Sequence, residues 1–214
     1  MSILRNKCDF GYSSEIKITT EKLMSKGRLE AFSDGVLAII ITIMVLELKV
    51  PQGTDLAALQ PLIPIFASYA LSFVFIGIYW NNHHHLFQAV HKVSGNVLWA
   101  NMHLLFWISL IPFTTSWMGE SEFVSWPVAL YGISLWMSGF AYYILVRTLL
   151  AIHPKDSPLA IAIGRDSKGY ISLVLYTIAI PLSFVSAMLA SLFYVAVAII
   201  WFIPDRRIEN TLTK

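Results

Sequence analysis

The feature that most limits how this chain can fold is a polar block that runs directly into an apolar helix. Residues 28–35 read Arg-Leu-Glu-Ala-Phe-Ser-Asp-Gly, and an apolar run from Val36 to Leu46 follows without a break. The eleven residues of that run are too few to cross a bilayer, which takes about 20. The polar block must therefore belong to the membrane-spanning helix, where ionisable residues are costly and usually functional.

The composition is that of a membrane protein with a single polytopic domain. Of the 214 residues, 57% are hydrophobic and only 13% are charged, whereas soluble domains carry about 25% charged residues. The net charge of +2 is small and the basic residues are scattered, which argues against nucleic-acid binding. Cys8 is the only cysteine, so no intrachain disulfide can form. We expect no cleaved signal peptide, because the N-terminus lacks an early apolar segment.

The apolar runs predict an all-α polytopic membrane protein with six transmembrane helices. We place the helices at residues 31–50, 62–82, 96–118, 125–147, 170–188 and 190–204. The last two come from one uncharged stretch of 35 residues, barely enough for two spans. A tight hairpin near residues 187–191 would divide it, and a re-entrant segment is the alternative. Pro181 is expected to kink the fifth helix.

The basic residues predict that both termini are cytoplasmic. With six spans in this orientation, 14 of the 15 Lys and Arg residues lie on the cytoplasmic side, and only Lys49 lies outside. We expect residues 1–27 to form a cytoplasmic N-terminal tail or a short surface helix. Residues 28–204 would form the six-helix transmembrane domain, and residues 205–214 a cytoplasmic C-terminal tail.

One face of the first predicted helix carries a stripe of aliphatic residues and one hydroxyl. At 100° per residue, Ile39, Thr42, Ile43 and Leu46 fall within an arc of about 100°, and Asp34 lies outside it. If several copies of this helix surrounded an axis, the aliphatic rings would form a constriction that gates by dewetting, with Thr42 adding a ring of oxygens. The alternative is that these residues face lipid or the core of the protein.

Asp34 needs a partner, since a buried unpaired carboxylate is costly. Arg28 lies about 240° away round the helix and cannot supply it. Partners on other helices are more plausible. The candidates are Trp80, Asn81, Asn82, His83, His84, His85, Asn101 and His103. Alternatively, Ser33 or Asp34 caps the helix and Arg28 lies among the lipid headgroups.

The run of histidines from His83 to His85 also invites a metal interpretation. His84 and His91 are two helical turns apart, but no cysteine is near and no carboxylate occurs in residues 56–119. A structural or pH-sensing role is favoured, so we expect no metal and no cofactor. The chain has no Walker A or HExxH motif and no convincing pair of carboxylates within the membrane, so we expect no enzyme activity.

The motif that opens the first helix resembles the signature of a known family. Arg28-x-x-x-Phe32-Ser33-Asp34, followed by Gly35 and an Ile-rich helix, is similar to the signature of the transmembrane protein 175 family of potassium channels. Four fixed polar or aromatic positions at the start of a first span make this motif specific. Further points of similarity are Tyr79-Trp80 with the histidines that follow, Asn101, and Pro112-Phe113.

The resemblance implies a homotetramer of six-helix units in which the first helices line a central pore. It implies a pore constriction at Ile39, Ile43 and Leu46, and ion coordination by Thr42. It also implies a network that braces the first helix, made of Arg28, Phe32, Ser33, Asp34, Trp80, His84 and Asn101. Neither the family nor this sequence has a selectivity filter of the TVGYG type. Animal lysosomal members carry two six-helix units, whereas this chain carries one, as bacterial members do.

We therefore expect a potassium-selective cation channel that conducts passively across the bacterial inner membrane. Its partners would be potassium ions, the lipid bilayer and copies of itself. The alternative is a secondary transporter that couples ions or protons through Asp34, although the inverted repeats that many transporters show are not evident. A membrane scaffold without transport activity is a third possibility, but it leaves the polar block unexplained.

Overall fold

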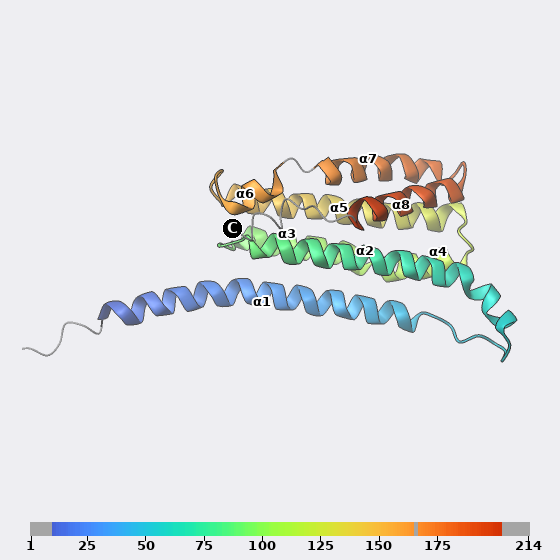
Figure 1. Cartoon of the computed structure of the whole chain (residues 1–214), viewed down its shortest axis with the longest axis horizontal. Coiled ribbons are helices and arrows are strands. Elements are labelled where there is room, and N and C mark those ends of the chain that lie inside the picture. Colours follow the sequence, from blue (N-terminus) through green and yellow to red (C-terminus); the bar gives the residue numbers. More distant parts are fainter. Residues whose placement is uncertain (1–9, 165–166, 203–214) are drawn as a thin grey trace, which may run out of the picture.

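The computed structural model describes residues 10–164 and 167–202, and within these ranges every regular element is a helix (Figure 1). The all-α prediction is confirmed. The elements are α1 (Phe10–Leu46), the 3₁₀ helix η1 (Leu56–Leu62), α2 (Ile63–Gln88), α3 (Gly95–Ser109), α4 (Ile111–Glu120), α5 (Ser125–Ala151), α6 (Pro158–Ile163), α7 (Ser167–Leu182) and α8 (Ala187–Phe202).

Four helical segments of the described chain are long and apolar enough to cross a membrane. They are Lys26–Leu46, Leu56–Gln88, Gly95–Glu120 and Ser125–Ala151, and each overlaps one of the first four predicted spans. Helices α7 and α8 are also apolar but have 16 residues each, a length of about 24 Å. They match the fifth and sixth predicted spans, whose crossing of the membrane stays a prediction.

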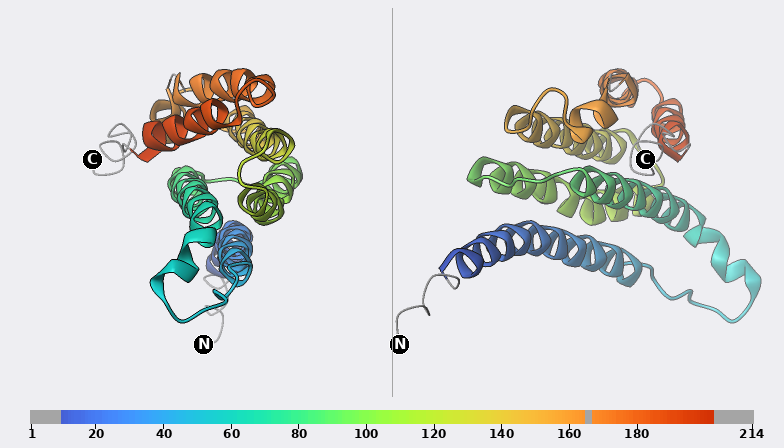
Figure 2. Two further views of the ribbon diagram at one scale, coloured as in Figure 1. Left: turned by 90° about the vertical axis from the view of Figure 1, so that its right-hand side faces the viewer. Right: turned by 60° about the vertical axis from the view of Figure 1, so that its left-hand side comes forward.

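The helices run side by side, with α1 at one edge of the bundle (Figures 1 and 2). Helix α1 packs on α2, α3 and α4, and α5 packs on α3, α4, α7 and α8. Helices α7 and α8 form the opposite side of the bundle (Figure 2). This order leaves a large part of the α1 surface without a neighbour among the described residues of the chain.

Helix α1 begins much earlier than the predicted first span. It starts at Phe10 and continues unbroken through residue 28, whereas we expect from the sequence a separate tail or a short surface helix over residues 1–27. Residues 10–27 contain no proline, and Glu and Lys favour the helix. Hydropathy marks where a helix enters lipid, but it does not mark where the helix begins.

The hairpin between the last two helices also differs from the prediction. Helix α7 ends at Leu182 and α8 begins at Ala187, so the turn covers residues 183–186 and not 187–191. The Ser186 hydroxyl accepts a bond from the Leu189 amide (3.4 Å) and so caps α8. Pro181 lies in the last turn of α7, one residue before the helix ends, and a kink at this position stays a prediction.

A helix break occurs where we had expected a continuous third span. Helix α3 ends at Ser109 and α4 begins at Ile111, with Leu110 between them. Pro112 has no amide hydrogen, so it cannot donate to the carbonyl four residues earlier. The proline is the physical reason for the interruption at this point.

Candidate functional site

The two faces of α1 have different surroundings. Leu29, Ser33, Leu37, Ile40 and Met44 recur at helical spacing, and all are buried against neighbouring helices. The predicted stripe lies on the other side of the helix. Its aliphatic members are exposed within the subunit, Ile39 by 58%, Ile43 by 43% and Leu46 by 80%. The structure thus places the stripe on an outer surface of the subunit and not in its core.

A buried chain of hydrogen bonds joins α1 to α3 and α2. Asn101 Nδ2 donates to Ser33 Oγ (2.9 Å), and Asn101 Oδ1 bonds to His83 Nε2 (2.8 Å). Ser33 Oγ in turn donates to the Leu29 carbonyl (2.9 Å). Because the NH₂ end of the Asn101 side chain faces Ser33, its carbonyl oxygen faces His83 and accepts a hydrogen from it. All three side chains are buried, so these bonds fix the position of α1 against two neighbours.

A second contact, nearer the surface, holds α1 to α2. Trp80 Nε1 donates to Asp34 Oδ1 (3.1 Å), which gives the carboxylate a partner on another helix. The Trp80 ring stacks on His84, with centroids 5.9 Å apart, and His84 Nε2 bonds to Gln88 Nε2 (2.8 Å). Trp80, one of the eight candidate partners of Asp34, is therefore the one in contact with it, on a side of α1 away from the stripe.

His84 is not the histidine that joins the helices, and the structure assigns that contact to His83. The hydrogen bonds of His84 stay within α2, whereas His83 reaches Asn101 of α3. Successive residues of a helix differ by 100° in direction, so only one of the two can point inward. The buried face of α2 passes through Ser72, Ile76, His83 and Phe87.

Arg28 and Phe32 are not brought into either contact within the subunit. Both are exposed, and helical spacing puts them on the same side of α1 as Ile39 and Leu46. Among the described residues, the structure records no hydrogen bond or ion pair for Arg28. Their assignment to the bracing network stays a prediction.

Thr42 is the polar member of the stripe. Its hydroxyl donates to the Ile39 carbonyl of the preceding turn (2.8 Å). The single hydroxyl hydrogen is thus used inside the helix, and the lone pairs of the oxygen can accept from another group or contact a cation. The geometry suits an acceptor that faces outward from an otherwise aliphatic surface.

A groove runs beside the stripe, between α1 and the α3–α4 pair. It has a volume of about 700 Å³, and its walls include Ile39, Ile43, Phe113 and Trp117. Glu47 and Glu120 also line it. Glu120 pairs with Lys49 (2.7 Å), and both side chains are exposed, so this pair contributes little to stability.

The histidines do not gather into a metal centre. Within the described part of the chain, no three His, Cys, Asp or Glu residues are placed to hold a metal ion. Helix α2 ends at Gln88, so His84 and His91 do not share a helical face as their spacing had suggested.

The contacts of His153 could not be predicted from the sequence. Its Nδ1 bonds to the Leu149 carbonyl (2.7 Å), and its Nε2 receives bonds from the backbone amides of His91 and Lys92 (3.2 and 3.4 Å). An isolated histidine after a helix carries no signal of such a contact. It connects the loop between α2 and α3 to the end of α5.

A cluster of hydroxyl groups was also missed. Ser72 Oγ lies 2.7 Å from Thr115 Oγ1 and 2.9 Å from the Tyr131 hydroxyl, and Thr115 donates to the Ile111 carbonyl (2.6 Å). Since Thr115 has used its hydrogen, Ser72 donates to Thr115 and Tyr131 donates to Ser72. The three residues join α2, α4 and α5 near the centre of the bundle, and no pattern along the chain relates them.

Comparison with known protein families gives a match that begins within α1 and extends to the start of α4. Residues 28–112 match the family described as the endosomal/lysosomal potassium channel TMEM175. The matched region contains the polar block, the stripe, Trp80, His83 and Asn101.

Individual proteins are similar over most of the chain. A protein named potassium channel from Chryseobacterium sp. is 58% identical over 191 residues, which cover 89% of this chain and 100% of that protein. Another protein named potassium channel, from Streptomyces collinus, is 33% identical and covers 78% of this chain and 90% of its own length. The crystal structure of a lysosomal potassium-selective channel TMEM175 homolog from Chamaesiphon minutus superposes with a TM-score of 0.75 at 29% identity, over 84% of this chain and 97% of that one.

Proposed function

The chain belongs to the TMEM175 family, whose members are channels and not enzymes, and we propose that it is a potassium-selective cation channel. It is a multi-pass membrane protein, and its bacterial relatives indicate a bacterial cell membrane. The observation that carries the proposal is the division of α1 into a braced face and an exposed aliphatic face.

The proposed assembly is a homotetramer with four α1 helices around a central pore. Helix α1 lies at the edge of the bundle, so its exposed face can meet the same face of other copies (Figure 2). Closed rotational symmetry is the usual form of such assemblies. The family resemblance of the motif at Arg28 and Asp34 supports four subunits in particular. Six spans with cytoplasmic termini remain part of the proposal, supported by the distribution of Lys and Arg.

In this assembly the stripe forms the narrow part of the pore. Rings of Ile39, Ile43 and Leu46 make a hydrophobic constriction, which is a barrier because ions must shed water to pass it. The oxygen of Thr42, whose hydrogen is engaged with the Ile39 carbonyl, replaces part of the hydration shell. Potassium gives up its water more easily than sodium, so a short apolar constriction favours potassium without a TVGYG filter.

Asp34 has a structural role in this proposal and is not a coupling site. Its carboxylate accepts from Trp80, and helical geometry directs it away from the stripe. With Ser33, Asn101 and His83 it holds α1 at a fixed angle, so that the constriction keeps its diameter. A coupled transporter would instead need Asp34 to exchange an ion or a proton during each cycle.

Flux from liposomes under defined ion gradients tests the proposal. Purified full-length protein should release potassium down its gradient faster than sodium, at a rate proportional to the driving force. Protein-free liposomes provide the background. Flux that saturates with ion concentration and moves protons in fixed proportion would show a coupled transporter and contradict the proposal.

A further inference from the structure

A second cavity lies on the side of the bundle away from α1, and the pore proposal does not use it. It has a volume of about 480 Å³ and is bounded by α2, α5, α7 and α8, with the end of α6 beside it. Its walls are mainly aromatic and aliphatic, and include Ile78, Tyr79, Tyr142, Leu173, Tyr176 and Trp201. The volume is within the roughly 300–1,000 Å³ of small-ligand sites.

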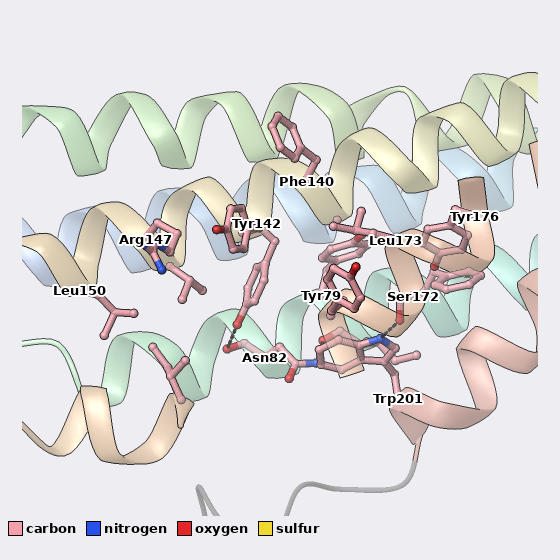
Figure 3. A pocket seen from close by; sticks show the side chains of 18 of the residues that line it. Tyr79, Asn82, Phe140, Tyr142, Arg147, Leu150, Ser172, Leu173, Tyr176 and Trp201 are labelled. Atoms are coloured by element: carbon pink, nitrogen blue, oxygen red, sulfur yellow. Dashed lines mark hydrogen bonds between the residues drawn. The ribbon is translucent and has the colours of Figure 1, made fainter. Parts of the chain in front are cut away.

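The two ends of this cavity differ in chemistry (Figure 3). Arg147 and Leu150 lie at one end, and Tyr79, Leu173, Tyr176 and Trp201 lie at the other. Among the described lining residues, Arg147 alone carries a formal charge. The cavity therefore has one cationic end and one apolar end, which is the pattern that an amphiphilic anion would match.

Arg147 has a cation–π contact but no counter-ion in the described chain. Its guanidinium carbon lies 6.0 Å from the centre of the Tyr143 ring. No described carboxylate lies within ion-pair distance of it; the ion pair that the structure does record joins Lys49 to Glu120. A cation beside an apolar cavity near the end of a membrane-spanning helix is stabilised by an anion, and a planar guanidinium suits the oxygens of a phosphate.

The indole and the serine hydroxyl at the apolar end already have partners. Trp201 Nε1 donates to Ser172 Oγ (2.8 Å), and Ser172 Oγ donates to the Lys168 carbonyl (2.8 Å). In the middle of the cavity, the Tyr142 hydroxyl donates to the Asn82 carbonyl (3.3 Å), as Figure 3 shows. Trp201, Ser172 and Tyr142 have thus used their donor hydrogens, and the rest of the wall is mainly aromatic and aliphatic, so the matching part of a ligand is a hydrocarbon chain.

We propose that this cavity binds one acyl chain of an anionic phospholipid, with the lipid phosphate at Arg147. Of the helices that bound the cavity, α2 and α5 are apolar and long enough to span the bilayer, and α7 and α8 are apolar but shorter. A ligand that is already in the membrane can therefore reach it. Basic pockets between transmembrane helices are known to hold anionic headgroups. A small hydrated anion would satisfy Arg147 but would leave the aromatic end empty. The proposal needs only membrane insertion, so it stands or falls separately from potassium conduction.

Photo-crosslinking of the unmodified protein tests where the acyl chain of the lipid lies. Full-length protein in liposomes would be exposed to a phosphatidylglycerol with a photoreactive group near the end of one acyl chain. Labels should map by mass spectrometry to the lining residues Leu173, Tyr176 or Trp201, and excess unlabelled phosphatidylglycerol should suppress them. Labels confined to lipid-facing residues such as Ile178, which is exposed, would overturn the proposal.

Charge variants test the headgroup contact. Arg147→Gln should lower the retention of phosphatidylglycerol about tenfold, measured by native mass spectrometry, because a charge-assisted hydrogen bond is lost. Lys155→Gln removes an exposed positive charge that does not line the cavity and should have no effect. Phosphatidylcholine of the same chain length should bind weakly to the unmodified protein. The proposal would be contradicted if the unmodified protein retained both lipids equally. It would also be contradicted if Arg147→Gln retained as much phosphatidylglycerol as Lys155→Gln.

A cavity-filling variant tests the contact between the lipid acyl chain and the apolar end of the cavity. Leu173→Trp should abolish retention of phosphatidylglycerol, whereas Val174→Trp, at the next and exposed position, should leave it unchanged. If Leu173→Trp does not fold, the crosslinking of the unmodified protein still decides the question. A free fatty acid or inorganic phosphate that displaces the lipid at equal concentration would show a different anionic ligand and overturn the phospholipid assignment.

Discussion

The two faces of α1 differ in their surroundings, and we propose that they separate support from conduction. The buried face carries Ser33, which is completely buried and hydrogen-bonded to Asn101 of α3. The exposed face carries Ile39, Ile43 and Leu46, with Thr42 as its only polar residue between Ile39 and Leu46. One face is fixed by its own subunit, and the other is left for contacts outside it.

The difference follows from the cost of polar groups in a membrane. Each polar group that is buried without a partner costs free energy, so serine and asparagine are stable where neighbouring helices can bond them. The hydroxyl of Thr42 donates its hydrogen to a carbonyl within α1, so it needs no donor–acceptor partner on a neighbouring helix. Ser33 and Asp34 of the polar block thus hold α1 to its neighbours, and the aliphatic stripe is the surface that we assign to the pore.

The buried face should be the more sensitive of the two to loss of a polar side chain. Asn101→Ala removes the oxygen that accepts from His83 and the amide nitrogen that donates to Ser33. This loss should lower the free energy of unfolding by about 1–3 kcal/mol. Thermal unfolding in detergent measures the change. Asn96→Ala, in the same helix but exposed, is the matched control. Equal destabilisation of the two variants would mean that the buried chain does not brace α1.

A substitution on the exposed face should change the conductance of the protein and not its stability. Ile39→Asn should wet the constriction and raise potassium flux about tenfold, which corresponds to about 1.4 kcal/mol of barrier, while potassium preference over sodium falls. Val45→Asn introduces the same side chain at an exposed position about 120° away round the helix and should leave flux unchanged. Unchanged currents in Ile39→Asn would remove this residue from the pore.

Asp34 should behave like the buried face, although it lies near the surface. Asp34→Asn keeps an oxygen that can accept from Trp80 but loses the charge that strengthens the bond, at a cost of about 1 kcal/mol. The yield of assembled protein should fall on size-exclusion chromatography, with ion preference unchanged. Glu122→Gln, an exposed loop carboxylate, should behave like the unmodified protein. A stable assembly with altered selectivity would place Asp34 in the conduction path.

Patterns within one helix could be predicted from the sequence, and relations between helices largely could not. The stripe from Ile39 to Leu46 follows from 100° per residue and needs no other helix. The choice between His83 and His84 depends on the rotation of α2 against α3, which a single helix does not encode. Trp80 and Asn101 could be named as candidates because polar residues in spans need partners.

Helix ends and breaks were predicted less well than helices. The start of α1 at Phe10 and the turn at residues 183–186 depend on local hydrogen bonds that hydropathy does not measure. The contacts of His153 and of Ser72 join residues far apart in the sequence. Their partners become apparent only when the helices are packed together.

Cysteine accessibility along α1 tests the central claim most directly. In a Cys8→Ser background, which removes the only native cysteine, single cysteines would replace Ile39, Thr42, Leu46, Leu37 and Ile40 in turn. A water-soluble, positively charged thiol reagent should block potassium flux at the first three positions and leave the last two unaffected. Block at Leu37 or Ile40, or none at the stripe positions, would contradict a pore lined by the exposed face of α1.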